Sequence, residues 1–392
     1  MPEDHRIYFD NAATSWPKPR GVLDEVARYL NENGAPAGRG AYNQALEVQH
    51  RVQNVRLQLA QHLSAPTPES IVFSANGTDS LNLAIHGILR PGDHVITSAA
   101  EHNSVLRPLE FLRQSADLEY SIVPCDSHGR LDPADFANAV RPNTKLIAVT
   151  AASNVTGTMQ PIREISEVAH AHEAIVLVDA AQLLGHAPCD VARLEIDLLA
   201  GSAHKGLLGI LGLGVLYVKP SLQALMRPLR QGGTGTQSAN IQQPQEFPQQ
   251  LESGNLNVPG IIALGEGLDY LNKVGIQQIA EHEQHLTQHL LDGLQSITGI
   301  QVYGSADASH QVGVVSLNFD ELSPQDAAAV LDAQFGIQVR AGFHCSPLIH
   351  PYLDSEKYGG TVRFSVGPFN TLEQVSVVIE SIRQLATCST QT

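Results

Sequence analysis

Short apolar runs alternate with amphipathic stretches from about residue 70 onward. The apolar runs are rich in Ile, Leu and Val and lie at 71–74, 94–98, 119–124, 145–151, 175–179, 197–201 and 215–218. Helix-like patterns fill several of the intervals, at 79–89, 104–114 and 162–172. This alternation predicts an α/β fold, with a mostly parallel seven-stranded sheet covered by helices on both faces. In such sheets, ligands bind at the carboxyl ends of the strands.

The pattern changes after residue 219. Positions 231–250 are rich in Gly, Gln, Thr and Pro and predict a long irregular segment, which in a compact domain usually has a function. Further helices are predicted at 259–274, 276–297, 324–334 and 372–385, and further strands at 300–303, 313–318, up to Arg340, and 361–366. We therefore expect a large domain at 15–258 and a small α+β domain made of 1–14 and 259–392.

The composition is that of a globular protein and narrows the classes of function. With 392 residues the chain is long enough for two domains. It has no apolar run long enough to cross a membrane and no secretory signal, which predicts a cytoplasmic protein without a membrane partner. Its formal net charge of −16 disfavours nucleic acid as a partner. The four cysteines form no CxxC pair, so neither a disulfide framework nor a metal site is expected.

Lys205 follows the predicted strand 197–201 in the segment Ser-Ala-His-Lys-Gly. Lysine rarely lies inside a protein without a partner. Loss of solvation lowers the pKa of a lysine and makes the amine a nucleophile toward aldehydes. A surface lysine in a turn is the alternative that this segment alone leaves open.

Asp179 ends an apolar strand and begins the segment Asp-Ala-Ala-Gln. A carboxylate there can keep the ring nitrogen of pyridoxal phosphate (PLP) protonated, which makes the ring an electron sink. Gln182 can bond to the phenolic oxygen of the same ring. Taken alone, Asp179 can equally be the cap of the next helix.

Other polar segments also follow predicted strands. Gly77 and Thr78 open the helix at 79–89, whose N-terminus suits a phosphate, and Ser202 and His204 can complete that site. His102 can stack on a cofactor ring, and Asn154 can contact the ring oxygen or the substrate. Each segment alone reads as an ordinary cap or turn, but a parallel sheet would gather all of them at one edge.

Cys345 lies in the segment Arg-Ala-Gly-Phe-His-Cys-Ser-Pro that begins at Arg340. Neighbouring histidine and arginine favour the thiolate form of a cysteine, and the glycine and proline predict a loop that can carry the thiol to a substrate. A small buried side chain is the alternative. Arg363 stands on an otherwise apolar strand and implies a buried anion, either a structural carboxylate or a substrate α-carboxylate.

Taken together, these motifs resemble the class V aminotransferase-like PLP enzymes, in the branch of cysteine desulfurases and selenocysteine lyases. The resemblance covers nearly the whole chain. Its motifs occur in the order DNAATS, GRGAY, NGTDSLN, AEHNS, SNVTG, VDAAQ, SAHKG, ESGNLN, VRAGFHC and VRFS. It implies PLP-dependent transferase fold type I.

The resemblance also implies a role for each motif. Lys205 would hold PLP, and the other cofactor contacts would be Asp179, Gln182, His102, Asn154, Gly77, Thr78, Ser202, His204 and Asn255. Cys345 would accept the sulfur, with Lys205 and His102 as the further catalytic residues. Substrate contacts would come from Arg363, Arg340, Arg39, Asn11 and Ala12.

One motif departs from the family pattern. The family usually has Glu-x-Gly-Thr, where threonine reaches a phosphate across a dimer interface, whereas this chain has Glu252-Ser253-Gly254-Asn255. The resemblance implies a homodimer, and Arg39, Gln237 and Asn255 lie in irregular segments that can reach across it.

The sequence thus predicts an enzyme that converts L-cysteine or L-selenocysteine to L-alanine and leaves a persulfide on Cys345. A sulfur-acceptor protein is a further possible partner. Two alternatives stay open at this point. One is a PLP-dependent cysteine or cystine C–S lyase, or an aminotransferase, that does not use Cys345. The other is a non-catalytic scaffold for sulfur assembly.

Overall fold

The computed structural model of the protein describes residues 6–38 and 40–389. Its largest element is a seven-stranded sheet in the order β2-β8-β7-β6-β5-β3-β4. The strands are β2 (Ile71–Ser74), β3 (His94–Ser98), β4 (Glu119–Val123), β5 (Thr144–Thr150), β6 (Ile175–Asp179), β7 (Leu198–Ser202) and β8 (Gly214–Val218). Strands β3 to β7 run parallel, and β8 is antiparallel to both of its neighbours. The predicted fold class is confirmed.

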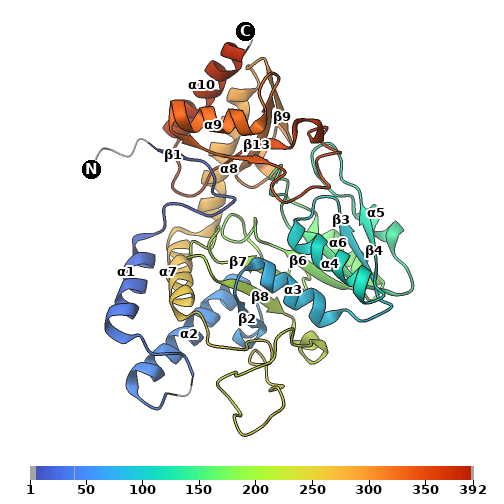
Figure 1. Cartoon of the computed structure of the whole chain (residues 1–392), viewed down its shortest axis with the longest axis vertical. Helices are drawn as coiled ribbons and strands as arrows, with labels where there is room; N and C mark the ends of the chain where they lie inside the picture. Colours follow the sequence, from blue (N-terminus) through green and yellow to red (C-terminus); the bar gives the residue numbers. More distant parts are fainter. Residues whose placement is uncertain (1–5, 39, 390–392) are drawn as a thin grey trace.

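Both faces of this sheet are buried, because its strands are apolar at successive positions. Along β5, Leu146 and Ala148 belong to one hydrophobic cluster, and Ile147 and Val149 belong to another. Successive side chains of a strand point to opposite faces, so a strand without polar alternation needs cover on both sides. The covering helices include α2 (Asn43–His62), α3 (Gly77–Ile88), α4 (Asn103–Ser115), α5 (Pro133–Ala139), α6 (Ile162–Ala171) and α7 (Val258–Val274) (Figure 1).

A smaller α+β unit packs at one end of the molecule (Figure 1). Its antiparallel sheet has the order β12-β13-β10-β9. The strands are β9 (Ile300–Tyr303), β10 (Val314–Phe319), β12 (Arg340–Gly342) and β13 (Thr361–Ser365), and the helices α8 (Ile276–Leu294), α9 (Pro324–Phe335) and α10 (Leu372–Ser389) pack with them. The N-terminal strand β1 (Ile7–Tyr8) pairs in parallel with β11 (Ile337–Gln338).

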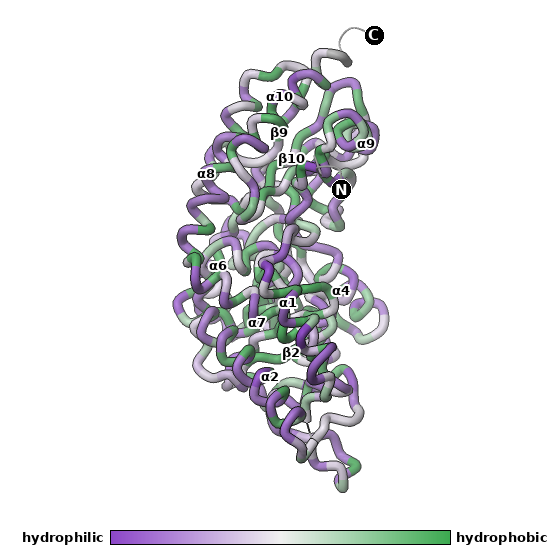
Figure 2. Tube along the Cα trace, turned by 90° about the vertical axis from the view of Figure 1, so that its left-hand side faces the viewer, coloured by the Kyte–Doolittle hydropathy of each residue, from purple (hydrophilic) through white to green (hydrophobic). Residues whose placement is uncertain are grey.

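Helix α8 connects the two cores. Its Ile279 belongs to the cluster under the large sheet, whereas Leu286 and Leu290 belong to the cluster of the small sheet. Figure 2 shows the apolar residues concentrated inside both parts of the elongated molecule. We propose that the chain is organised as two domains, with α8 shared between them.

The prediction of one strand that ends at Arg340 is wrong in one respect. The structure divides it, because β11 pairs with β1 and β12 pairs with β13, so Arg340 begins a strand of a different sheet. Helix α1 (Arg20–Arg28) and helix α2 were not predicted. The short elements are a π turn at Tyr29–Asn33 and 3₁₀ turns at Pro68–Ser70, Pro220–Leu225, Ala308–His310 and Glu356–Tyr358.

The segment 231–250 is irregular, as predicted, and projects from the end of the molecule opposite the small unit (Figure 1). Within the described part of the chain, every helix is too short or too polar to span a bilayer.

Candidate active site

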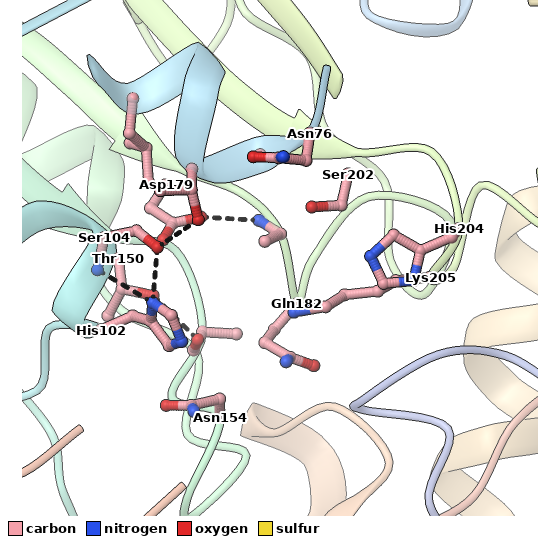
Figure 3. Close-up of a pocket in the computed structure, with 15 residues that line it drawn as sticks. Asn76, His102, Ser104, Thr150, Asn154, Asp179, Gln182, Ser202, His204 and Lys205 are labelled. Carbon is pink, nitrogen blue, oxygen red and sulfur yellow. Dashed lines mark hydrogen bonds between the residues drawn. The ribbon is translucent and has the colours of Figure 1, made fainter. Parts of the chain in front are cut away.

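A cavity of about 160 Å³ opens at the carboxyl edge of the large sheet (Figure 3). Each wall comes from a segment that follows a strand, since parallel strands end at a common edge. Nine of the residues predicted for the site line it: Gly77, Thr78, His102, Asn154, Asp179, Gln182, Ser202, His204 and Lys205.

Lys205 follows β7 and is held by the N-terminal segment. The hydroxyl of Ser15 donates to the carbonyl oxygen of Lys205 at 2.9 Å, and Thr14 Oγ1 and Lys18 Nζ donate to the carbonyl of His204 at 3.0 and 2.7 Å. Burial lowers the pKa of Lys205 to about 8, and the negative charge of Asp179 acts in the opposite direction. The amine therefore loses its proton more readily than an ordinary lysine, as a nucleophile toward an aldehyde requires.

Asp179 ends β6 and is buried. Its Oδ1 accepts from the backbone N–H of Ala181 at 3.0 Å, and its Cα partner on β5 is Thr150. Glu101 is fully buried near it, and desolvation, reinforced by Asp179, raises the pKa of Glu101 to about 8. A pKa of about 8 keeps Glu101 largely protonated at neutral pH, and Asp179 is the carboxylate that lines the cavity.

The turn between β2 and α3 is shaped for an anion. Asn76 caps α3 by accepting from the backbone N–H of Asp79 at 2.9 Å. A Cβ atom at Gly77 would lie 2.4 Å from Ser202 Oγ, so a larger residue would displace this hydroxyl from the turn. His204 Nδ1 is buried without a hydrogen-bond partner among the described residues. These donors and the helix N-terminus form a cradle suited to a phosphate.

His102 caps α4 from the other side of the cavity. Its Nδ1 accepts from the backbone N–H of Ser104 at 3.0 Å, which places the proton of the neutral ring on Nε2. Burial lowers the pKa of His102, which favours this neutral form. Ser104 also bonds to Thr78, with 2.7 Å between the two hydroxyl oxygens, and so connects the α3 and α4 turns.

Gln182 and Asn154 both form side-chain hydrogen bonds to segments that lie next to the cavity. Gln182 Nε2 donates to the carbonyl of Ala12 at 2.9 Å. Asn154 Nδ2 donates to the carbonyl of His344 at 2.6 Å, and its Oδ1 accepts from Ser346 Oγ at 2.6 Å. Asn154 therefore joins the wall of the cavity to the loop that carries Cys345.

Cys345 is exposed and lies on a groove next to the cavity. This groove shares Thr78, His102 and Ser104 with the cavity. The backbone φ angles of His344 and Cys345 are 51° and 60°, a left-handed conformation that costs energy in residues other than glycine. The thiol is thus held at the edge of the cavity by a strained loop.

The other cysteines whose side chains the structure describes have different surroundings. Cys125 and Cys189 are buried, and burial raises the pKa of each to about 12. Both are protonated and inert at neutral pH. Among the three described thiols, Cys345 alone is accessible to a substrate.

The predicted substrate residues lie beside the cavity lining. Arg363 Nη2 donates to Asp10 at 3.0 Å, and its Nη1 donates to the carbonyl of Asn154 at 3.0 Å. Arg340 contacts the same Asp10 through Nε and Nη2 at 3.1–3.2 Å. Burial lowers the pKa of Arg363, whereas its bond to Asp10 raises the pKa of Arg340.

The remaining predicted residues that the structure describes do not line the cavity. Asn11 Nδ2 donates to the carbonyl of Ser365 at 2.9 Å, and the N–H of Ala12 donates to Ser365 Oγ at 2.9 Å. Asn255 lines a second cavity of about 120 Å³, together with Arg56 and Glu252. Arg39 lies outside the described residues.

Several residues of the site were not singled out from the sequence. Ser104 and Thr150 line the cavity, Glu101 lies near Asp179, and Asp10 bridges the two arginines. Asp10, Glu101 and Ser104 stand inside motifs that were recognised, next to residues that were chosen. Thr150 carries no sequence signal beyond its place at a strand end.

Comparison with known proteins agrees with this geometry. The family model of class-V aminotransferases matches residues 7–378. A probable cysteine desulfurase of Methanothermobacter thermautotrophicus is 37% identical over 387 residues, which cover 98% of this chain and 95% of the relative. The apo structure of a cysteine desulfurase from Thermococcus onnurineus superposes with a TM-score of 0.91 at 32% identity, covering 97% of this chain and 95% of the other. A cysteine desulfurase structure from Escherichia coli has a TM-score of 0.86 at 28% identity, with the same coverage.

Proposed function

The chain belongs to the class-V aminotransferase family, and on that basis we propose that it is a cysteine desulfurase, an enzyme that removes sulfur from L-cysteine and leaves L-alanine. One observation carries the proposal. The loop bearing the exposed Cys345 is bonded to Asn154 in the cavity wall and to Asn103 beside His102. An accessible thiol therefore lies at the edge of a cavity that contains an activated lysine.

The residues of the cavity fit PLP as the cofactor. Lys205 provides the amine for its aldehyde, and Asp179 provides a carboxylate for its ring nitrogen. The cradle at Gly77, Thr78 and Ser202, with the unpartnered His204 Nδ1, provides a site for its phosphate. When bound, PLP supplies an electron sink that makes the Cα–H and Cβ–S bonds of an amino acid easier to break.

Protons are moved by Lys205 and His102 in this proposal. The Lys205 amine would take the α-proton of the substrate, since burial lowers its pKa to about 8 and so allows part of it to be neutral near neutral pH. His102 can donate its Nε2 proton and take it back. The Asp179 carboxylate would hold the ring nitrogen of the cofactor.

Arg363 and Arg340 bind the α-carboxylate of the substrate. The guanidinium of Arg363 is buried, and its Nε has no hydrogen-bond partner among the described residues, so it has donor capacity left for an anion. The side chain of Arg340 is half exposed, so it is accessible to a substrate that enters from solvent. Asn11 and Ala12 hold the turn that carries Asp10.

Cys345 takes the sulfur. Its thiolate attacks the sulfur of the bound substrate, the new S–S bond forms, and the electron pair of the Cβ–S bond goes to the substrate carbon. Protonation of that carbon gives alanine, and the persulfide remains on Cys345 for transfer to an acceptor thiol. L-Selenocysteine is a second substrate candidate because its Cβ–Se bond can break in the same way.

We further propose a cytoplasmic homodimer with a sulfur-acceptor protein as partner. A second copy would complete the second cavity, which Asn255 and residues of the segment 231–250 line. Asn255 can donate to a phosphate in the partner's site, in place of the usual threonine.

Product analysis tests the proposed function. The purified holoenzyme is incubated with L-cysteine, and the products are identified with and without a thiol reductant. Alanine and sulfide in equal amounts are expected, with sulfide release dependent on the reductant. Pyruvate and ammonia would show a C–S lyase instead, and the absence of any PLP absorbance band would indicate a scaffold.

A further inference from the structure

The loop that carries Cys345 is held at the two backbone carbonyls that precede the thiol. The carbonyl of Phe343 accepts a hydrogen bond from His350 Nε2 at 3.1 Å. The next carbonyl, that of His344, accepts from Asn154 Nδ2 at 2.6 Å. His350 comes from the end of the same loop and Asn154 from the wall of the cavity, so the turn before the thiol is fixed from two sides.

The imidazole of His344 adds a third anchor. Its Nε2 lies 3.0 Å from the carbonyl oxygen and 2.9 Å from the Oγ1 of Thr361. A carbonyl oxygen only accepts hydrogen bonds, so we assign the proton of the ring to Nε2. Both side chains are buried, and water does not compete for this bond. Since Thr361 and Arg363 both belong to β13, the bond ties the Cys345 loop to the strand of the buried arginine.

The ring of His344 is neutral in this position. Burial, and then the positive charge of Arg363, hold the pKa of its imidazole well below the usual range. Its Nδ1 is buried and has no hydrogen-bond partner among the described residues. The sequence suggested that a neighbouring histidine favours the thiolate of Cys345, but a neutral ring adds no positive charge there. The cations that interact with Cys345 are Arg340 and Arg363.

The backbone at His344 and Cys345 needs this support. The φ angles of 51° and 60° place two successive residues in the left-handed region, which is costly for most side chains. Such a turn persists only where the surrounding contacts hold it. Without an anchor it would relax toward a commoner conformation and move the thiol with it.

We propose, on the basis of the proposed function, that His344 is a positioning residue for sulfur transfer. As a neutral hydrogen-bond donor to Thr361, it keeps the strained turn in the conformation that presents the Cys345 thiol at the edge of the cavity. It neither moves protons nor binds the cofactor. Steps that use Lys205 without Cys345 are therefore independent of His344.

Two amide variants separate this role from the alternatives. The amide nitrogen of His344→Gln reaches the place of Nε2 and still donates to Thr361, although it cannot exchange a proton as an imidazole does. The shorter amide of His344→Asn reaches only the place of Nδ1, where no partner lies among the described residues. Asparagine tolerates a positive φ better than glutamine, so a purely backbone effect would favour the asparagine variant. A role in proton transfer would impair both variants alike.

The test measures two rates in the holoenzyme of each variant. Alanine formed from L-cysteine in a single turnover reports on sulfur transfer, and exchange of the α-proton of L-alanine for solvent deuterium reports on the cofactor site. His344→Asn should form alanine about tenfold more slowly, since a buried hydrogen bond next to the reacting thiol is lost, whereas His344→Gln should stay within about threefold of the wild type. The α-proton exchange should be unchanged in both. His310→Asn, at an exposed histidine, is the control for the substitution itself.

Equal rates of alanine formation in the two amide variants, or a slower rate in His344→Gln, would overturn the inference. A matching loss of α-proton exchange in His344→Asn would also overturn it, because that result indicates general damage to the site. If His344→Asn does not fold, His344→Leu takes its place, since leucine also lacks the donor.

A wild type that forms no alanine from L-cysteine would overturn the proposed function instead. Amide hydrogen–deuterium exchange of the peptide that contains Cys345 still tests the anchor in that case. Faster exchange is expected in His344→Asn than in His344→Gln, and equal exchange in the two would show that the bond to Thr361 does not hold the loop.

Discussion

The backbone N–H of Asn103 donates a 2.7 Å hydrogen bond to the carbonyl oxygen of Cys345. Asn103 is the first residue of α4 and follows the capping residue His102. An N–H at the start of a helix has no partner within the helix, so it is free to hold another segment. The loop with the exposed thiol of Cys345 is thus attached to the same helix end that carries His102.

Ser346→Ala should slow sulfur transfer without loss of the cofactor. The Ser346 hydroxyl is buried and bonds to Asn154 Oδ1, so its removal loosens the Cys345 loop by ~1 kcal/mol. We expect about a fivefold lower rate of alanine formation and an unchanged PLP absorbance spectrum. Ser296→Ala, at an exposed serine, is the control. A wild-type rate in Ser346→Ala would contradict the proposed attachment.

Lys205→Met should stabilise the apoprotein at neutral pH. The pKa of Lys205 is about 8 in the folded protein and 10.5 as a model value, so the unfolded chain binds more protons between these values. The gap corresponds to ~3 kcal/mol of destabilisation below about pH 8, which fades as the pH rises toward about 10.5.

Urea unfolding of the apoprotein at about pH 7 and about pH 10 measures this effect. The advantage of Lys205→Met should shrink at the higher pH, while Lys273→Met, at an exposed lysine, should change little. An equally large advantage at both pH values would show that burial of the charge is not its cause.

Glu101→Gln should stabilise the protein at alkaline pH. The pKa of Glu101 is raised from 4.5 to about 8, chiefly by burial, so the folded state holds a proton that the unfolded state loses. The free energy of unfolding of the wild type therefore falls as the pH rises from about 5 to about 8. Glutamine keeps the shape without the proton.

Thermal unfolding at about pH 6 and about pH 9 compares the two proteins. The variant should gain more in Tm relative to the wild type at the higher pH than at the lower pH. Equal differences at both pH values would mean that Glu101 does not titrate in this range.

Glu252→Gln should destabilise the protein by about 3–5 kcal/mol, because it leaves Arg56 as an unpaired buried charge. Arg56 and Glu252 form two hydrogen bonds at 2.8 and 3.0 Å, and their side chains are 2% and 6% exposed. This pair anchors the chain just before Asn255. Arg141→Met breaks an exposed pair and should cost no more than ~1 kcal/mol, and a similar loss in both variants would contradict the distinction.

The sequence predicted the large sheet well, because buried parallel strands appear as continuous apolar runs. β2, β3 and β6 have the predicted bounds. Helix α2 was missed, since its exposed face is rich in Gln and its buried face includes Arg56 among small apolar residues. The division of the predicted strand into β11 and β12 at Val339 could not be predicted. β11 pairs with β1 and β12 pairs with β13, and these partners come from opposite ends of the chain.

The site was predictable where residues follow strands, and less so where contacts join distant segments. Lys205 follows β7 and Asp179 ends β6, and these strands are neighbours in the sheet. The apolar pattern of the sequence indicates both strands. The contact between Asp10 and Arg363 spans most of the chain. Asn154 appeared as a cofactor residue from its motif, but its bonds to the Cys345 loop depend on how the small unit packs.

The most direct test of the account is the mass of the enzyme after a single turnover. The holoenzyme is mixed with an equal amount of L-cysteine in the absence of reductant, and its peptides are analysed by mass spectrometry. The account predicts one molecule of alanine per active site and one additional sulfur atom on the peptide that contains Cys345, with neither formed by Cys345→Ala. Alanine formed at the wild-type rate by Cys345→Ala, or sulfur found on another residue, would contradict it.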